Sequence, residues 1–497
     1  MKSTKRLFLF LLSFALTLSV IHGVFAQGKQ YDQVTFAYAT FNNIPSSEAL
    51  ADVEEAINQI TRDKIGAEVK LMPIVIWEYS SQVSLALQGG EKLDVFQSLG
   101  DFNTAISTGM CIDLTDMLDS LAPESTALIG DAWLAATSFE GKVYGIPTYK
   151  PIALTPMVVY RKDIADELGL DMSAVNNVND VTEVLRKVKT AYPEMTPLAA
   201  VNTGNIGIGL TVPNVDYLTD SYFSPKGVLM NDELKVVDFY ASEEFEAVAR
   251  LARTWYNEDL VMKDAATTAS TAAELMASGN YFCYIASYSY PEEDTAASLE
   301  AQAGGYPLGA KIIGTAFLDT SSINALSWMI ASTSKVPEAA LKFLNLTFTD
   351  KDVVNLLIYG LEGRDYVFNN DGTVRYPDGH DASTVPYTAQ LSVGTLGNFF
   401  IMHSLQGTNP ESLAWELEQN INAKTSVAMG FTFDSTPVKT EYTAVINVIE
   451  QFLPGLVCGS SDPDTDIPIF LQRLSEAGLD EIIAEKQAQL DHWLANK

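Results

Sequence analysis

Residues 141–163, GKVYGIPTYKPIALTPMVVYRKD, carry the strongest indication of how this chain folds. Two apolar runs of β-strand character flank a segment with tyrosines, and three prolines lie along the stretch. Proline fixes the backbone dihedral φ and so restricts which bonds can turn. The chain shows no low-complexity linker and no internal repeat. These features predict an extended crossing between two lobes that share a hinge, with Gly145 as its one free joint.

A regular alternation of strands and helices precedes this crossing. The runs at 34–41, 67–76 and 92–99 have strand patterning, and helical spacing occupies 46–65 and 77–91 between them. The order β-α-β-α-β predicts a parallel sheet covered by helices. Ligands of such sheets lie beyond the carboxyl ends of the strands, so the residues at those ends are candidate contacts.

A second alternating sector follows the crossing. Amphipathic helices are predicted at 179–193 and 242–260, and 271–287 reads as a helix, a Gly-Asn turn and a strand. An Asn-Asp-Gly turn at 370–372, between alternating strands, predicts a β-hairpin. The chain closes with helical patterning from 440 onward. The sequence therefore predicts two α/β sectors joined by extended crossings.

Composition excludes several classes of partner and of fold. The formal net charge of −32 would repel nucleic acid and anionic membranes, so neither is an expected partner. With 47% hydrophobic and 10% aromatic residues, wholesale disorder is excluded. Cys111, Cys283 and Cys458 are far apart and odd in number. We expect buried free thiols, with a disulfide in an oxidising compartment as the alternative.

The first residues predict export. A short basic region precedes an apolar run, and the small residues Val24 and Ala26 occupy the positions that signal peptidase recognises. We expect a signal peptide over 1–26 that is cleaved after Ala26; a retained membrane anchor is the alternative. The mature protein would be periplasmic or extracellular.

Four segments carry a resemblance to a known family. Residues 141–171 and SWMIASTSKVPEAALKFLN, at 327–345, resemble the first crossing and the returning strand and helix of extracellular solute-binding proteins of ABC importers, family 1, the maltose-binding-protein type. GLEGRDYVFNNDGTVRYPDG, at 360–379, and the tail from 430 are similar to the LipO-like branch, which ends in a domain of unknown function. Together the segments span essentially the whole mature chain.

The resemblance implies a type II periplasmic-binding-protein-like fold of the α/β class. Each lobe would be a mainly parallel sheet flanked by helices, with hinge crossings between the lobes. After the signal peptide, the first lobe (N-lobe) is expected to comprise 27–152 and the return segment 320–385. The second lobe (C-lobe) would comprise 153–319 and 386–497, including the terminal helices.

The function implied is that of a clamp, which captures a solute in the cleft and delivers it to the transmembrane subunits of an ABC permease. The resemblance implies that the solute is a sugar or oligosaccharide, and we expect a monomer without a cofactor. One departure is that Gln27, not a cysteine, follows the cleavage site, so no lipid anchor is expected. A secreted carbohydrate-active enzyme and a peptide-binding receptor are the alternatives.

Candidate ligand contacts follow from sugar chemistry. Sugars stack their C–H faces on aromatic rings, and carboxylates and amides bind their hydroxyls. Trp77 and Glu78 follow the second predicted strand, Asp101 follows the third, and Asn42 and Asn43 follow the first. The alternatives are core packing for Trp77, a favourable place in the first turn of a helix for Glu78, and a turn-forming role for the asparagines.

Further candidates lie on the crossing, the returning strand and the C-lobe. Tyr149, with Tyr144 as a second choice, would face the cleft floor, and Trp328 lies on the returning strand. Tyr222 and Tyr288 are the C-lobe candidates. For all of these aromatics the alternative is packing in the core or at the lobe junction.

Catalytic and metal motifs are missing from the sequence. No GxSxG, HExxH or GxxxxGK[ST] pattern occurs. Residues 462–473 have the alternating acids of a calcium loop, but the sixth position is Ile467 and the twelfth is Arg473, which rules out an EF-hand and predicts a helix cap instead. We therefore predict no catalytic residue and no metal site.

Overall fold

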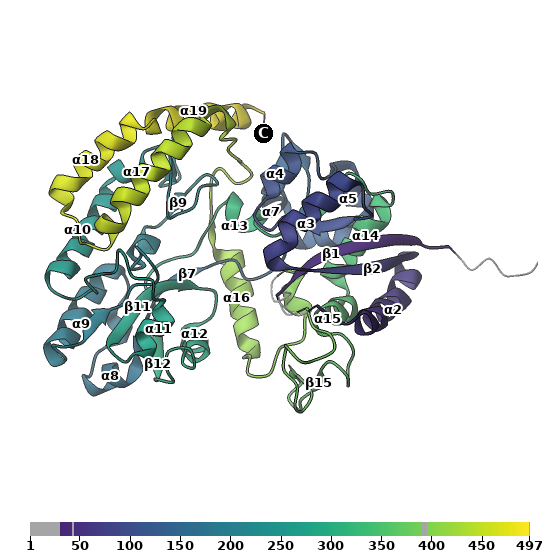
Figure 1. The fold of residues 1–497 in the computed structure, drawn as a ribbon, viewed down its shortest axis with the longest axis horizontal. Coiled ribbons are helices and arrows are strands. Elements are labelled where there is room, and N and C mark those ends of the chain that lie inside the picture. The colour runs from purple at the N-terminus through teal and green to yellow at the C-terminus, as the bar shows by residue number, and fades with distance from the viewer. Residues whose placement is uncertain (1–29, 42–43, 390–394, 497) are drawn as a thin grey trace, which may run out of the picture.

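The computed structural model describes residues 30–41, 44–389 and 395–496. Figure 1 shows two α/β lobes side by side, joined by chain crossings between them. Within the described residues, no helix combines the length and apolar character needed to span a bilayer. The predicted signal peptide, Asn42 and Asn43 lie outside the described residues.

The N-lobe is built on a five-stranded sheet in the order β2-β1-β3-β14-β6. Its first three strands are parallel, as predicted, whereas β14 and β6 each run antiparallel to their neighbour. The returning strand thus joins the N-lobe sheet, as the resemblance implied. The strands are β1 (Asp32–Thr40), β2 (Ala67–Val75), β3 (Val95–Gln97), β6 (Ile146–Pro147) and β14 (Ser327–Ile330).

Alternation along β1 gives the N-lobe sheet two buried faces. Phe36 and Tyr38 enter one hydrophobic cluster, and Ala37 and Ala39 enter the other, because successive side chains of a strand point to opposite faces. Helices cover both faces in Figure 1. They are α2 (Ser47–Lys64), α3 (Ile76–Gly89), α4 (Phe102–Ser107), α5 (Thr115–Leu121), α6 (Pro123–Ile129), α7 (Asp131–Ala135), α14 (Pro337–Thr349) and α15 (Lys351–Tyr359).

The C-lobe sheet has the order β12-β7-β11-β8. β7 (Thr155–Arg161) is antiparallel to both β11 (Tyr281–Tyr288) and β12 (Leu308–Ile312); only β11 and β8 (Thr196–Leu198) are parallel. The prediction of a mainly parallel sheet is therefore wrong for this lobe. The chain enters the C-lobe along its central strand β7, and its two neighbours both run back toward the crossings.

Helices complete the C-lobe in two groups. The first packs on the sheet: α8 (Lys162–Glu167), α9 (Val178–Ala191), α11 (Ala272–Ala277) and α12 (Glu292–Leu299). The second forms a separate core with β9 (Val215–Asp216) and β10 (Leu229–Met230), and Figure 1 shows it as an outer layer of long helices. These are α10 (Glu243–Asn257), α17 (Lys439–Val457), α18 (Pro463–Glu476) and α19 (Leu479–Ala495). Asp462 caps α18, as predicted.

The crossings are held together by side-chain hydrogen bonds. Asn420, near the end of α16 (Pro410–Asn422), accepts the backbone N–H groups of Ile152 at 3.0 Å and Ala153 at 3.1 Å. Its amide nitrogen donates to the carbonyl oxygen of Lys150 at 2.7 Å. Two further crossing strands, β13 (Phe317–Leu318) and β17 (Lys424–Thr425), pair in parallel. The hinge thus comprises several segments: Asn420 ties the first crossing to α16, and strand pairing joins β13 to β17.

Two expectations about the crossings need correction. Gly145 is not a free joint, since a Cβ atom there would lie 3.1 Å from the carbonyl oxygen of Trp328. Close packing explains the glycine. The C-lobe also does not resume at 386, because Tyr387 and Leu396 lie in the N-lobe core. The chain reaches the C-lobe core only near Trp415 on α16.

Two smaller predictions are confirmed. The hairpin around the Asn-Asp-Gly turn forms from β15 (Val367–Phe368) and β16 (Val374–Arg375). All three cysteines are buried free thiols.

Candidate functional site

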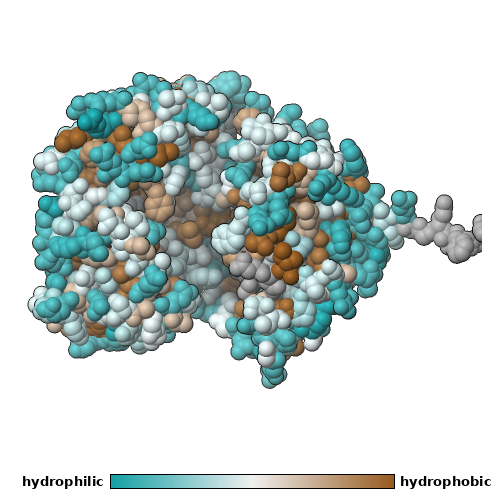
Figure 2. All heavy atoms as spheres, in the orientation of Figure 1, coloured by the Kyte–Doolittle hydropathy of each residue, from teal (hydrophilic) through white to brown (hydrophobic). Residues whose placement is uncertain are grey.

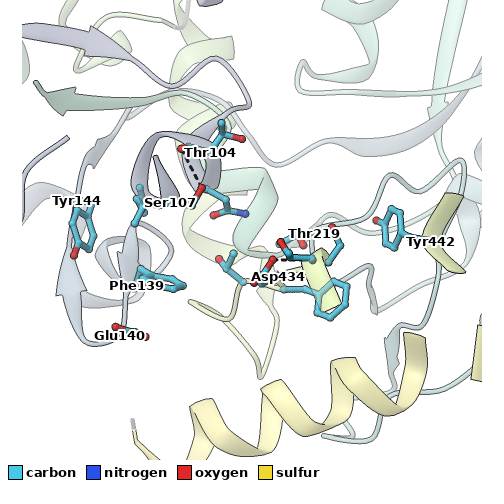
Figure 3. Close-up of a pocket in the computed structure, with 14 residues that line it drawn as sticks. Thr104, Ser107, Phe139, Glu140, Tyr144, Thr219, Asp434 and Tyr442 are labelled. Atoms are coloured by element: carbon cyan, nitrogen blue, oxygen red, sulfur yellow. Dashed lines mark hydrogen bonds between the residues drawn. The ribbon is translucent and has the colours of Figure 1, made fainter. Parts of the chain in front are cut away.

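A cavity of about 650 Å³ lies between the two lobes. Its N-lobe wall is made by α4 and by the hairpin of β4 (Ser138–Phe139) and β5 (Lys142–Val143). The opposite wall comprises Thr219, the segment 432–436 and Tyr442. Figure 2 shows the deep hollow between the lobes, and Figure 3 shows the side chains that line the cavity. A molecule held here would contact both lobes.

The β4–β5 hairpin carries the N-lobe wall toward the cavity. Its two loop residues, Glu140 and Gly141, both have positive φ, at 51° and 74°, as the tightest hairpin turns require. This turn places Phe139 and Glu140 at the cavity, and Tyr144 lies beside them (Figure 3). The backbone N–H of Tyr144 donates to the carbonyl of Thr137 at 3.0 Å, which fixes its position.

The opposite wall is positioned by the last helix. The backbone N–H of Asp434 donates to the side chain of Gln489 on α19, and Gln489 donates back to the Asp434 carbonyl, both at 2.9 Å. The Asp434 carboxylate accepts the N–H of Thr436 at 2.9 Å. The buried hydroxyl oxygen of Thr432 has no hydrogen-bond partner. Buried polar atoms normally have one, so this hydroxyl is available to a ligand.

Tyr442 is held at the cavity by a buried charge. Its hydroxyl donates to the carboxylate of Asp220, and burial, together with that negative charge, raises the pKa of the phenol. The lining contains the carboxylates of Glu140 and Asp434 and no basic side chain. Aromatic rings, hydroxyls and carboxylates around the cavity suit an uncharged, polyhydroxylated ligand.

A second, smaller cavity of about 70 Å³ extends the N-lobe wall at the carboxyl end of β3. It is lined by Gln97 and Asp101 among others, and it shares Thr104 of α4 with the larger cavity. The side-chain oxygen of Gln97 is buried without a partner. The predicted contact Asp101 therefore lies at the candidate site.

Trp77 and Glu78 lie at the same sheet edge, directly after β2, but neither lines these two cavities. Trp77 is 75% exposed, so the alternative of core packing does not hold. The Glu78 carboxylate accepts the side-chain amide of Gln82 at 2.5 Å and is also exposed. Both side chains remain candidate contacts at the carboxyl ends of the strands.

Two aromatic predictions resolve in favour of packing. The Tyr149 ring lies between Trp133 and Phe400, with centroids 5.6 and 5.4 Å away, at the lobe junction. Trp328 is 1% exposed, stacks on Phe36 at 4.6 Å and donates its indole N–H to the Thr395 carbonyl. The prediction of Trp328 as a ligand contact is wrong, because its side chain lies wholly in the core.

The C-lobe tyrosines also make internal contacts. Tyr222 packs against Phe223 with ring centroids 3.8 Å apart, and the hydroxyl of Tyr288 lies 2.8 Å from that of Tyr284. Neither lines the large cavity. The C-lobe wall instead uses Thr219, the segment 432–436 and Tyr442, which sequence reasoning missed because none of them belongs to a binding motif or follows a predicted strand. Tyr144, the second choice on the crossing, does line the cavity.

Comparisons with known proteins agree with this architecture. A carbohydrate ABC transporter substrate-binding protein of Streptococcus pneumoniae serotype 4 is 24% identical over 444 residues, covering 88% of this chain and 87% of the relative. The crystal structure of NgtS, the N-glycan transport solute-binding protein of S. pneumoniae, superimposes with a TM-score of 0.76 at 22% identity, covering 94% and 99% of the two chains.

A complex of NgtS with Man1GlcNAc gives a TM-score of 0.64 at 21% identity, with 93% of this chain and 100% of that chain covered. The sequence model described as a domain of unknown function (DUF3502) matches residues 427–495, the segment that builds one cavity wall and α17–α19. The model described as bacterial extracellular solute-binding protein matches residues 55–359. The two-lobed fold and this match agree, and the chain belongs to the family of bacterial extracellular solute-binding proteins.

Proposed function

We propose that the protein is the substrate-binding component of an ABC importer for carbohydrates, and that it captures an oligosaccharide in the cavity between α4 and the segment 432–436. The observation that carries the proposal is the composition of this cavity, in which aromatic rings and carboxylates from both lobes, together with the unpaired hydroxyl of Thr432, surround about 650 Å³. The names of the relatives, which concern carbohydrates and N-glycans, support the same ligand class.

Lobe closure is the proposed mechanism of capture. The ligand makes its full set of contacts only when both walls approach it, so binding shifts the population toward a closed form. The chain superimposes better on the structure of NgtS than on that of its Man1GlcNAc complex, with TM-scores of 0.76 and 0.64. This supports an arrangement of the present chain with the lobes apart.

We further propose how the protein is exported and how it delivers its ligand. The signal peptide over 1–26 is cleaved after Ala26, and the mature protein, without a lipid anchor, works as a monomer outside the cytoplasm. It presents the bound sugar chemically unchanged to the transmembrane permease subunits. Incubation of purified protein with each bound oligosaccharide, followed by chromatography, should return the intact sugar; a cleaved product would favour the enzyme alternative.

The proposal is tested by a thermal-shift screen of mono- and oligosaccharides, amino acids and peptides, followed by calorimetry on each hit. Ligands that bind the folded state raise the melting temperature by mass action. We expect at least one oligosaccharide to bind and no amino acid or peptide to do so. Man1GlcNAc and Man5GlcNAc, named with NgtS, are among the probes.

Two matched variants locate the site. Phe139 and Phe368 are each partly exposed, at 39% and 42%, on hairpins of similar size, but only Phe139 lines the cavity. Phe139→Ala should weaken oligosaccharide binding by about tenfold, because it removes a stacking surface worth about 1 kcal/mol or more. Phe368→Ala should leave the affinity unchanged. Equal affinities for the two variants would exclude this cavity as the site.

A further inference from the structure

A buried carboxylate without any hydrogen-bond partner lies away from the cleft cavity. Glu416, on α16, is 1% exposed, and both of its carboxylate oxygens lack a partner. The other buried glutamate in the described chain, Glu54, accepts from Lys70 Nζ and from the backbone N–H of Leu71, each at 2.9 Å. Burying an ionised group without a partner is costly, so the isolation of Glu416 calls for a function.

Glu416 lines a cavity of about 470 Å³ with a strongly aromatic wall. The rings come from Phe41, Tyr290, Tyr359, Tyr376 and Phe399, and among the described residues that line the cavity none is a lysine, arginine or histidine. It shares no lining residue with the cavity between α4 and the segment 432–436. A single unpaired negative charge is thus surrounded by aromatic rings and apolar side chains.

The surroundings of Glu416 add negative charge and supply no positive charge. Asp294, on α12, raises the pKa of Glu416 further after the larger effect of burial, to about 7. Asp294 has partners of its own, since Ser412 Oγ and the side-chain amide of Asn409 donate to it. Both donors reach the Oδ2 atom of Asp294, and Asp294 does not line the cavity. A positive charge in the cavity would therefore be attracted by two carboxylates, of which Glu416 lines the cavity and has two oxygens without a partner.

We propose that this cavity is a second binding site, specific for a small organic molecule that carries a protonated primary amine. The ammonium group donates to the two free oxygens of Glu416, a charge-assisted hydrogen bond that is stronger than one from a neutral hydroxyl. The aromatic faces attract the cation and cover the rest of the molecule. A neutral alcohol of the same shape gains neither the ion pair nor the cation–π attraction.

The occupant would contact both lobes. Glu416 lies on α16, which joins the C-lobe through the packing of Trp415 and the hydrogen bonds to Asp294, and Tyr290 follows the C-lobe strand β11. Tyr359 belongs to the N-lobe core, and Phe399 is buried, its backbone N–H donating to the carbonyl of Tyr149 on the first crossing. An amine in this cavity therefore bridges the lobes beside the crossings, and it can bind independently of any sugar in the cleft.

The test compares matched amine and alcohol probes on the full mature chain. Benzylamine and glucosamine are titrated beside their neutral counterparts, benzyl alcohol and glucose, by calorimetry at about pH 8, where Glu416 is ionised. We expect at least one amine to bind about tenfold or more tightly than its neutral counterpart, the ratio expected for gaining one charged hydrogen bond.

Two variants on α16 locate the effect. Glu416→Gln keeps the side-chain shape and removes the charge, so it should abolish the preference for the amine. Glu418→Gln removes an exposed carboxylate two residues away and should leave the preference intact. Circular dichroism verifies that both variants fold. The proposal is overturned if no amine binds to the wild type, if amine and alcohol bind equally, or if folded Glu416→Gln keeps the preference.

Discussion

Two buried carboxylates of this protein have opposite surroundings. Asp220 accepts from Lys486 Nζ at 2.8 Å, from the backbone N–H of Lys226 at 2.7 Å and from the hydroxyl of Tyr442. Glu416, which is also buried, has no hydrogen-bond partner. Asp220 ties α19 to the cavity wall and so maintains the fold. A buried charge with its partners in place is thus structural, whereas the unpaired carboxylate of Glu416 is the one to which we assign a binding role.

The largest expected effect comes from breaking the satisfied cluster. Lys486 is fully buried and donates to both Asp220 and the Gly227 carbonyl. Lys486→Ala removes the shorter of the two ion pairs of Asp220 and leaves only Lys226 Nζ, at 3.5 Å, so we expect a loss of about 3 kcal/mol in the free energy of unfolding, at the low end for a broken buried pair. Urea denaturation measures this loss. Lys424→Ala, which breaks the exposed pair with Asp232, should cost less than about 1 kcal/mol. Equal losses would contradict the structural role.

The hinge contains a neutral buried side chain, Asn420, whose removal can be compared with the loss of a buried charge. Asn420 makes three hydrogen bonds to the first crossing. Asn420→Ala therefore leaves two backbone N–H groups and one carbonyl without this hydrogen-bond partner. We expect a loss of about 1–3 kcal/mol in unfolding free energy. Asn422→Ala, in the same final turn of α16 but exposed, is the matched control and should change stability by less than about 0.5 kcal/mol. A loss that is the same for both variants would show that Asn420 does not hold the hinge.

The unpaired carboxylate of Glu416 predicts that the stability of the folded protein falls as pH rises. The pKa of Glu416 is about 7 in the folded protein against an ordinary value of 4.5, so the folded state holds this proton more tightly than the unfolded state. Ionisation therefore lowers stability as pH rises from about 4.5 through 7, and below that window the penalty vanishes. Glu416→Gln should be more stable than wild type at pH 8 and gain little at pH 4.5.

Melting temperatures of wild type, Glu416→Gln and Glu418→Gln across this pH range test the prediction. Subtraction of each variant from wild type removes the contribution of all other titrating groups. Glu418→Gln should show no such trend, since its side chain is exposed. A difference between wild type and Glu416→Gln that is constant with pH, or a variant that is less stable at pH 8, would show that the charge of Glu416 is compensated.

The smallest effect on stability is expected for an exposed ring. Trp77 and Leu85 are 75% and 68% exposed on the same helix, α3. Each alanine substitution should change the free energy of unfolding by less than about 0.5 kcal/mol. Trp77→Ala should nevertheless weaken oligosaccharide binding about tenfold, whereas Leu85→Ala should not. Calorimetry on both variants decides whether Trp77 joins the site when the lobes close; unchanged affinity for Trp77→Ala would remove it.

Locally encoded features could be predicted from the sequence. The β-α-β-α-β order, the Asn-Asp-Gly hairpin and the cap at Asp462 depend on nearby residues, and each was found. The directions of the C-lobe strands were not predictable in this way. The spacing of hydrophobic residues identifies a strand but does not determine its neighbours or whether it runs parallel to them. The tight packing at Gly145 depends on Trp328 and Phe102, which lie far from Gly145 in the sequence and belong to other elements of the fold.

The candidate site was predictable only in part, for the same reason. Trp77 and Trp328 both adjoin predicted strands, but Trp328 lies within the N-lobe core and Trp77 faces solvent. Sequence alone could not distinguish them. The segment 432–436 has no binding motif and reaches the cavity because Gln489, far along the chain, holds its backbone. Site residues supplied by tertiary contacts of this kind stay invisible to local patterns.

The proposed function requires a carbohydrate to close the two lobes over the cavity between α4 and the segment 432–436. Small-angle X-ray scattering of the mature protein, with and without the tightest-binding oligosaccharide of the screen, measures this closure. Binding should reduce the radius of gyration in wild type, and Phe139→Ala should need a correspondingly higher sugar concentration for the same change. Saturating sugar that leaves the radius of gyration unaltered, or a screen in which no carbohydrate binds, would contradict the account.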